Sequence, residues 1–139
     1  MDYTELIRSA LDARKRSYAP YSQYNVGAAI LCADGDIITG SNIENASYSA
    51  TVCAERSAIF TAVSAGKHDF TAIAIAGGRK EESDKMSDYA YPCGICRQVM
   101  REFVSPGTFK VIVARSPDDY REYYLSELLP DSFGPDNLS

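Results

Sequence analysis

The sequence predicts an α/β fold, a three-layer α/β/α sandwich around a mixed sheet of about five strands. The first observation behind this prediction is a set of short apolar runs of strand length, at Val26–Leu31, Thr71–Ala76 and Phe109–Ala114. The second is that helix-length segments separate these runs, as in βαβ units. The third is an Asp-Gly turn that directly follows the first run and predicts an antiparallel hairpin at one side of the sheet.

The first predicted helix covers about Tyr3–Ser17, with Asp2 as its N-cap. Four apolar side chains form one stripe along it, namely Leu6, Ile7, Ala10 and Leu11. The cations of Arg14–Arg16 fall in the last turn, where they suit the helix dipole and read as a solvated helix end.

The hairpin is followed by a segment that is unusually polar for a strand leading into the core. The turn is Ala33–Asp36 and the returning strand begins at Ile37. Beyond it, Asn42 and Glu44 stand in the polar segment Gly40–Ser47. These two residues are either plain turn residues or hydrogen-bonding groups for a polar substrate, and the residues alone leave both interpretations open.

The rest of the chain alternates between helices and strands. The second helix is rich in small residues, which suits a buried central position, and Gly66 follows it as a C′ residue. The third strand is apolar on both faces, as expected in a sheet covered by helices. The predicted elements are helix Thr51–Ala65, strand Thr71–Ala76, an unassigned charged stretch Gly77–Tyr91, helix Cys93–Phe103, strand Phe109–Ala114 and a short strand near Arg121–Tyr124.

Composition limits the class of protein. The 139 residues fit one domain spanning 1–139, and the content of 45% hydrophobic and 24% charged residues is typical of a soluble globular protein. The net charge of −5 argues against a long phosphate backbone as partner, because nucleic-acid binders usually carry a basic face. No apolar run is long enough to span a bilayer, and the N-terminus lacks the pattern of a signal peptide. We therefore expect a cytoplasmic protein that binds neither nucleic acid nor membrane.

Three cysteines and one glutamate carry the candidate chemistry. Cys53 stands alone, whereas Cys93 and Cys96 form a Cys-x-x-Cys pair, and each set lies at the predicted start of a helix. Three thiolates can hold a tetrahedral Zn²⁺ whose fourth position stays open to water, which is the layout of a catalytic site. Glu55, two residues from a ligand, can then move protons. Arg56, three residues from Cys53, can hydrogen-bond the thiolates and withdraw some of their negative charge.

Two other interpretations of the cysteines compete with catalysis. Cys32 can complete a four-sulfur structural site, although a buried inert thiol is commoner at the end of an apolar strand. A redox pair at Cys93 and Cys96 explains neither Cys53 nor Glu55. The only histidine, His68, lies between a helix and a strand, and its isolation argues against a histidine-based catalytic triad.

Cys53–Arg56 together with Pro92–Gln98 resembles the signature of the cytidine deaminases in its three-cysteine form. The resemblance continues outside the zinc motif and covers nearly the whole chain in order. It includes Pro20–Ala28, Asn42–Tyr48 and Leu128–Phe133. The combination of the Asn-x-Glu-Asn segment with the tail phenylalanine is similar to the short-chain members of the family that act on free nucleosides.

The resemblance implies a role for each matching residue. Cys53, Cys93 and Cys96 would ligate one zinc per chain, and Glu55 would be the proton shuttle. The remaining roles concern the substrate: Asn42 and Glu44 would bind the ribose, the backbone of Ala54 and the Glu55 carboxylate would meet the pyrimidine edge, Tyr24 would stack on the base, and Phe133 would reach it from a neighbouring subunit.

Two departures from the family pattern fall at the substrate. Tyr24-Asn25 stands where Phe-Pro is more usual, and Tyr91 stands where the family often has Ser before Pro92. The Tyr91 carbonyl is the expected acceptor for the 4-amino group, so that the backbone role survives the change of side chain. A charged stretch around Arg79–Asp88 also lengthens the gap between the first and second cysteine ligands.

The function implied is hydrolytic deamination of cytidine and 2′-deoxycytidine to the uridines with release of ammonia, a step of pyrimidine salvage. The family forms homotetramers with shared active sites, which we expect here too. Two alternatives remain. One is a different aminopyrimidine substrate, such as a nucleoside antibiotic or a base within nucleic acid. The other is a zinc-stabilised module without catalysis.

Overall fold

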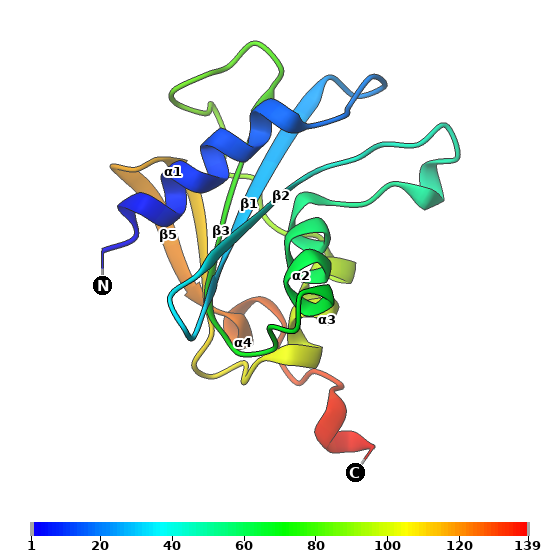
Figure 1. Cartoon of the computed structure of the whole chain (residues 1–139), viewed down its shortest axis with the longest axis vertical. Helices are drawn as coiled ribbons and strands as arrows, with labels where there is room; N and C mark the ends of the chain where they lie inside the picture. The colour runs from blue at the N-terminus through cyan, green and yellow to red at the C-terminus, as the bar shows by residue number, and fades with distance from the viewer. Residues whose placement is uncertain (1, 139) are drawn as a thin grey trace.

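The computed structural model describes residues 2–138 and contains one five-stranded sheet in the order β2-β1-β3-β4-β5 (Figure 1). The strands are β1 (Tyr24–Cys32), β2 (Ile37–Ser41), β3 (Phe70–Arg79), β4 (Lys110–Ser116) and β5 (Asp119–Tyr124). The α-helices are α1 (Thr4–Ala13), α2 (Ala54–Ser64), α3 (Gly94–Phe103) and α4 (Leu125–Leu128). Only β3 and β4 pair in parallel, so the sheet is mixed as predicted.

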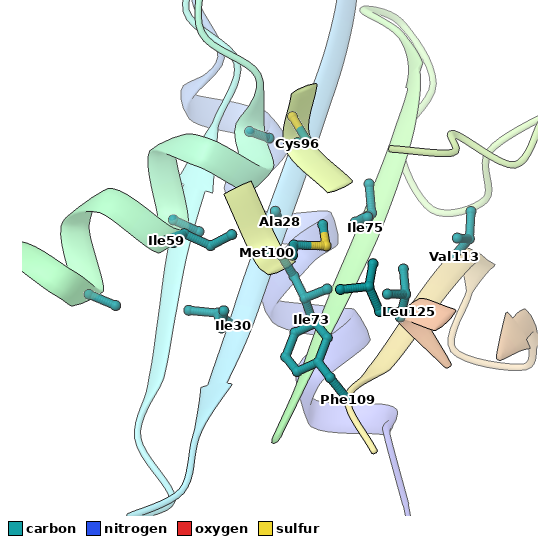
Figure 2. Packing of buried hydrophobic residues seen from close by; sticks show 14 residues of the cluster. Ala28, Ile30, Ile59, Ile73, Ile75, Cys96, Met100, Phe109, Val113 and Leu125 are labelled. Atoms are coloured by element: carbon teal, nitrogen blue, oxygen red, sulfur yellow. The ribbon is translucent and has the colours of Figure 1, made fainter. Parts of the chain in front are cut away.

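The helices lie on both faces of the sheet, which confirms the three-layer prediction. Helix α1 covers one face, whereas α2 and α3 cover the other (Figure 1). The core is correspondingly divided into two clusters. Ile7 and Ala10 of α1 pack against alanines of β3 on the first face, and Ile59 of α2 and Met100 of α3 pack against the second. Figure 2 shows the second cluster, in which Phe109 and Met100 lie with Ile73 of β3.

The hairpin and the crossover follow from local sequence. Gly35 has a φ of +97°, a left-handed conformation that glycine adopts without strain, and it turns β1 back into the antiparallel β2. Strand β3 runs parallel to β4, and α3 forms the connection between them. Strands β2 and β3 are both antiparallel to β1, so they also run in one direction, and α2 connects them. Both helices on this face therefore begin at the same end of the sheet, which brings their N-termini together.

The first helix differs from its prediction. It ends at Ala13, a 3₁₀ turn covers Arg14–Arg16, and Tyr3 rather than Asp2 is the N-cap. Asp2 still accepts a hydrogen bond from the Thr4 amide at 2.9 Å. The interpretation of Arg14 as a solvated helix end was wrong, since this residue is only 4% exposed.

Arg14 is buried because its guanidinium group bonds to main-chain carbonyls. It donates to the carbonyls of Asn25 at 2.8 Å, Gly78 at 3.1 Å, Arg79 at 2.9 Å and Glu82 at 3.0 Å. These bonds tie the start of β1 to the end of β3 and to the charged stretch that could not be assigned from the sequence. Within residues 2–138 no helix is long and apolar enough to cross a membrane.

Candidate active site

The N-termini of α2 and α3 bring three thiols together. Cys53 and Cys93 are the N-caps of their helices, one position earlier than the first turn in which the sequence placed them, and Cys96 lies in the first turn of α3. The three sulfurs lie within 4.8 Å of one another. Cys93 Sγ is 3.9 Å from Cys53 Sγ and 3.5 Å from Cys96 Sγ.

This cluster fits a zinc ion. Two sulfurs bound at about 2.3 Å to one tetrahedral centre are separated by about 3.8 Å, close to the spacing found here. The helix N-termini favour negative charge at the sulfurs. Three ligands from the protein leave a fourth position of the tetrahedron for a water or substrate atom.

Electrostatics also favour a cation at the thiols. The contact with the Cys96 thiol, together with Arg56, lowers the pKa of Cys53 to about 5. The same contact with Cys53, together with burial, raises the pKa of Cys96. The Cys53 thiolate thus opposes ionisation of the Cys96 thiol beside it, and a divalent cation is what would stabilise several thiolates side by side.

Arg56 lies against the cluster as the sequence suggested. Its Nη2 atom is 3.5 Å from Cys53 Sγ, and the proximity of the sulfurs raises the pKa of the guanidinium group. The Nε atom of Arg56 is buried and has no hydrogen-bond partner among the described residues. The cation is thus directed at the thiolates and not at a carboxylate.

Glu55 is buried beside the thiols, in the first turn of α2. Only 4% of the residue is exposed, and this burial raises the pKa of its carboxyl group to about 7, with a further contribution from the Cys53 thiolate. A carboxyl group with a pKa near neutrality can both accept and release a proton at physiological pH. The position is therefore suited to proton transfer.

A cavity of about 330 Å³ opens beside Glu55 and the thiols. It is lined by most of the residues that the sequence marked for the substrate, namely Tyr24, Asn42, Ala54 and Tyr91, along with Cys53 and Cys93. Helix-terminal N–H groups such as that of Ala54 have no partner within their own helix, so they can donate to a ligand. The size and mostly apolar lining suit a small planar molecule with a few polar groups.

Asn42 connects this cavity to β1. Its side-chain oxygen accepts from the Val26 amide at 2.9 Å, and its side-chain nitrogen donates to the Tyr24 carbonyl at 2.9 Å. The amide is thereby fixed in orientation. One N–H and one oxygen lone pair remain for another partner.

Glu44 lies in an adjoining cavity of about 390 Å³, between Tyr21 and Tyr48. Its carboxylate accepts from the amides of Tyr21 at 3.0 Å and Ser22 at 3.1 Å, and from the Ser22 hydroxyl. Thr51 lines both cavities and joins them. Asn42 and Glu44 therefore line two cavities that share Thr51, and the cavity of Asn42 also includes Cys53 and Cys93.

Phe133 is not part of this cavity within its own chain. It is 59% exposed on the C-terminal tail, where its carbonyl accepts from Gln98 Nε2 of α3 at 2.9 Å. Cys32 is also not part of the site. It is buried at the end of β1 and is not among the three clustered thiols. The four-sulfur interpretation therefore has no support among the described residues.

Sequence reasoning missed several residues that line the cavity. Val26, Val52, Ile75 and Ala90 form much of its apolar wall, but in the sequence they resemble ordinary core residues. Thr51 carried a usable signal, because it lies two residues before the first thiol. The others become visible only once β1, β3 and the segments that lead into α2 and α3 are placed side by side.

Comparison with known proteins gives cytidine deaminases, both by family model and by sequence identity over the whole chain. The family described as the cytidine and deoxycytidylate deaminase zinc-binding region matches residues 1–114. A cytidine deaminase of Halalkalibacterium halodurans is 45% identical over 139 residues, which cover 100% of this chain and 99% of the relative. One from Sporosarcina psychrophila is 42% identical, with 100% and 96% covered.

Solved structures of cytidine deaminases also resemble the fold of this chain. The crystal structure of a cytidine deaminase from Burkholderia pseudomallei has a TM-score of 0.85 at 42% identity, covering 96% of this chain and 100% of the other. One from Mycobacterium tuberculosis has a TM-score of 0.78 at 36% identity, with 96% and 98% covered.

Proposed function

Because this chain belongs to the cytidine and deoxycytidylate deaminase family, we propose that residues 1–139 form one catalytic domain in which Glu55 and the thiol cluster deaminate cytidine and 2′-deoxycytidine. The chain is a zinc-dependent enzyme of hydrolytic deamination that takes one zinc per chain. The observation that carries the assignment of roles is the buried Glu55 carboxyl, next to three clustered thiols, at the wall of a cavity large enough for a pyrimidine.

Cys53, Cys93 and Cys96 hold the zinc in this proposal. When bound, the zinc polarises a water molecule so that it can act as a nucleophile near neutral pH. Arg56 donates toward Cys53 Sγ and moderates the negative charge that three thiolates bring to the ion.

Glu55 carries the protons. It accepts one from the attacking water while a C–O bond forms at C4, and it delivers that proton to N3. It then transfers the proton of the new hydroxyl group to the amino group, which leaves as ammonia while the C4 carbonyl forms. The product keeps the proton at N3, so water and cytidine give uridine and ammonia without any other reactant. A pKa of about 7 suits a carboxyl group that must act in both directions.

The remaining cavity residues hold the nucleoside. The Ala54 amide and the Glu55 carboxyl meet the O2 and N3 edge of the base, and Tyr24 lies along the ring. Asn42 and Glu44 bind the ribose, since they line the joined cavities next to Thr51. The Tyr91 carbonyl accepts from the 4-amino group, which orients the leaving group beside Cys93.

The test is the ultraviolet absorbance change of cytidine incubated with the zinc-loaded protein, compared with Glu55→Gln. Conversion to uridine by the natural chain is expected, with a loss of at least about 10³-fold in kcat for the variant at unchanged zinc content. A near-normal rate in Glu55→Gln would refute the role of the carboxyl group. No conversion by the natural chain would move the search to other aminopyrimidines.

The tail supports a homotetramer with shared active sites. Phe133 is exposed, and its carbonyl is held to α3 through Gln98, which supports the proposal that its ring enters the cavity of a second copy. Exposed apolar side chains at Phe60 and Ile95, on the helices that carry the site, are further surface for such contacts. Light scattering after size-exclusion chromatography should give four chains, and a monomer with full activity would contradict the proposal.

Free nucleoside is the proposed form of the substrate, and the cytoplasm the proposed compartment. The net charge of −5 opposes binding to a phosphate backbone, and the clustered thiols require a reducing environment. Turnover of free cytidine should therefore be nearly independent of salt. A strong preference for single-stranded nucleic acid at low salt would favour the alternative substrate.

A further inference from the structure

The side chain of Tyr91 is an unusual cavity wall. It lines the proposed nucleoside cavity two residues before Cys93, yet 42% of the residue is exposed and it belongs to an irregular segment rather than to a helix or strand. A half-exposed tyrosine on such a segment would ordinarily sample several rotamers. A wall that moves in this way must be ordered when a ligand binds, and the ordering lowers affinity.

The register of the sheet directs two side chains of β5 toward this wall. Val111 and Val113 of β4 point into the core cluster under α2 and α3. Their partners across the antiparallel pair are Tyr123 and Arg121, respectively. Side chains of directly opposed residues lie on the same face of a sheet, so both β5 side chains lie on the face that carries the site.

Both of these side chains bond to the Tyr91 hydroxyl group. Arg121 Nη1 donates to Tyr91 Oη at 2.6 Å, and Tyr123 Oη lies 3.2 Å from the same atom. The rings of Tyr91 and Tyr123 meet edge to face, with centroids 6.0 Å apart. Neither Arg121 nor Tyr123 is among the residues that line the cavity. The hydroxyl end of Tyr91 is thus anchored outside the cavity by residues that do not touch its contents.

Arg121 is itself held in place by aromatic groups. Its guanidinium carbon lies 4.2 Å from the centroid of the Tyr89 ring, and the Tyr89 hydroxyl donates to Asp119. Among residues 2–138 no carboxylate lies within ion-pair distance of Arg121, so the phenol and the aromatic face are its partners. A planar guanidinium group can stack on one ring and donate to a second group at once, which lysine does less well.

We propose that Arg121 is a positioning residue for the deamination, acting with Tyr123 from β5 to fix Tyr91 as a rigid wall of the nucleoside cavity. The proposal rests on the proposed function of that cavity. Arg121 does not touch the substrate. It sets the shape that the cavity has before the nucleoside arrives, and its effect therefore falls on nucleoside binding more than on the proton transfers of Glu55.

The experiment is a double-mutant cycle of Arg121→Met and Tyr91→Phe in the zinc-loaded protein, read by KM and kcat for cytidine. Each single variant should raise KM about five- to tenfold with kcat within about twofold, and the double variant should be no worse than either single one. Arg121→Lys keeps a donor and should recover part of the loss. Arg115→Met is the matched control. Arg115 also lies over the Tyr89 ring, at 5.3 Å, and pairs with Asp119 at 3.1 Å, but the hydrogen bond to the Tyr91 hydroxyl comes from Arg121.

Two readouts do not depend on turnover. Each variant should keep one zinc per chain, and calorimetric titration with uridine should show the same weakening of Kd as the rise in KM. If the natural chain failed to deaminate cytidine, the proposed function would fall while the uridine titration still tested the wall. Unchanged KM and Kd in Arg121→Met, even with a lower melting temperature, would overturn the proposal. So would losses that multiply in the double variant, or equal losses in Arg115→Met.

Discussion

Replacing Arg14 by methionine tests whether a buried guanidinium group holds the start of β1 to the end of β3, at one end of the sheet. Four carbonyls lose a donor in this variant, at Asn25, Gly78, Arg79 and Glu82. Only the bond to Gly78 is fully buried, so that carbonyl would stay unsatisfied at about 1–3 kcal/mol, whereas the three others can be rehydrated at about 0.5–1 kcal/mol each. Burial lowers the pKa of Arg14, which shows that the charge is poorly solvated, and methionine removes that cost.

The net expectation is a loss of about 2–4 kcal/mol in the free energy of unfolding. For a chain of this length the melting temperature falls by roughly 5–15 °C. Urea unfolding of the zinc-loaded protein measures the change, and Arg8→Met, on the exposed side of the same helix, is the control that should change stability by less than about 0.5 kcal/mol. Equal stability of the Arg14 and Arg8 variants would refute the reasoning.

Three further substitutions test the thiolate environment, the four-sulfur alternative and the packing of β2 against α2. Arg56→Met removes the donor to Cys53 Sγ and should weaken zinc binding about 10- to 100-fold in competition with a chelator; unchanged affinity would contradict its role at the thiolates. Cys32→Ala should keep one zinc per chain and an unchanged KM, and loss of metal would revive the four-sulfur site. Gly40→Ala places a methyl group against the backbone of α2 at Ala58 and should cost about 1–3 kcal/mol, whereas a neutral effect by urea unfolding would show that the helix can shift.

The residues that sequence alone located are those whose chemistry is local. The spacing of Cys93 and Cys96 sets both thiols on one turn, and Glu55 is fixed two residues from Cys53 whatever the rest of the fold does. Strands β1, β3 and β4 were likewise predictable, because each contains an apolar run whose length and composition favour a buried strand. The boundaries were less accurate: β3 continues through Gly77 and Gly78, which the sequence left in an unassigned stretch.

Arg14 shows what local patterns cannot supply. Its predicted position in the last turn of a helix and its neighbours Lys15 and Arg16 are typical of a solvated cation. Nothing in the sequence indicates that main-chain carbonyls accept hydrogen bonds from its guanidinium group. Those carbonyls belong to strand ends and a loop up to 68 residues away. Because a main-chain carbonyl is present at every residue, this type of partner leaves no mark on composition or spacing.

Tyr91 and Arg121 extend that argument to the active site. Thirty residues separate them, and they meet because the register of β4 and β5 places Arg121 opposite Val113 on the face that carries the thiols. A shift of one residue in that register would turn Arg121 to the opposite face and leave Tyr91 without its anchor. The departure at Tyr91 therefore becomes interpretable only together with β5. A bulky side chain at the cavity rim narrows the cavity. If it were free to move, its ordering on binding would lower the affinity for the nucleoside, and anchoring it from outside the cavity avoids that loss.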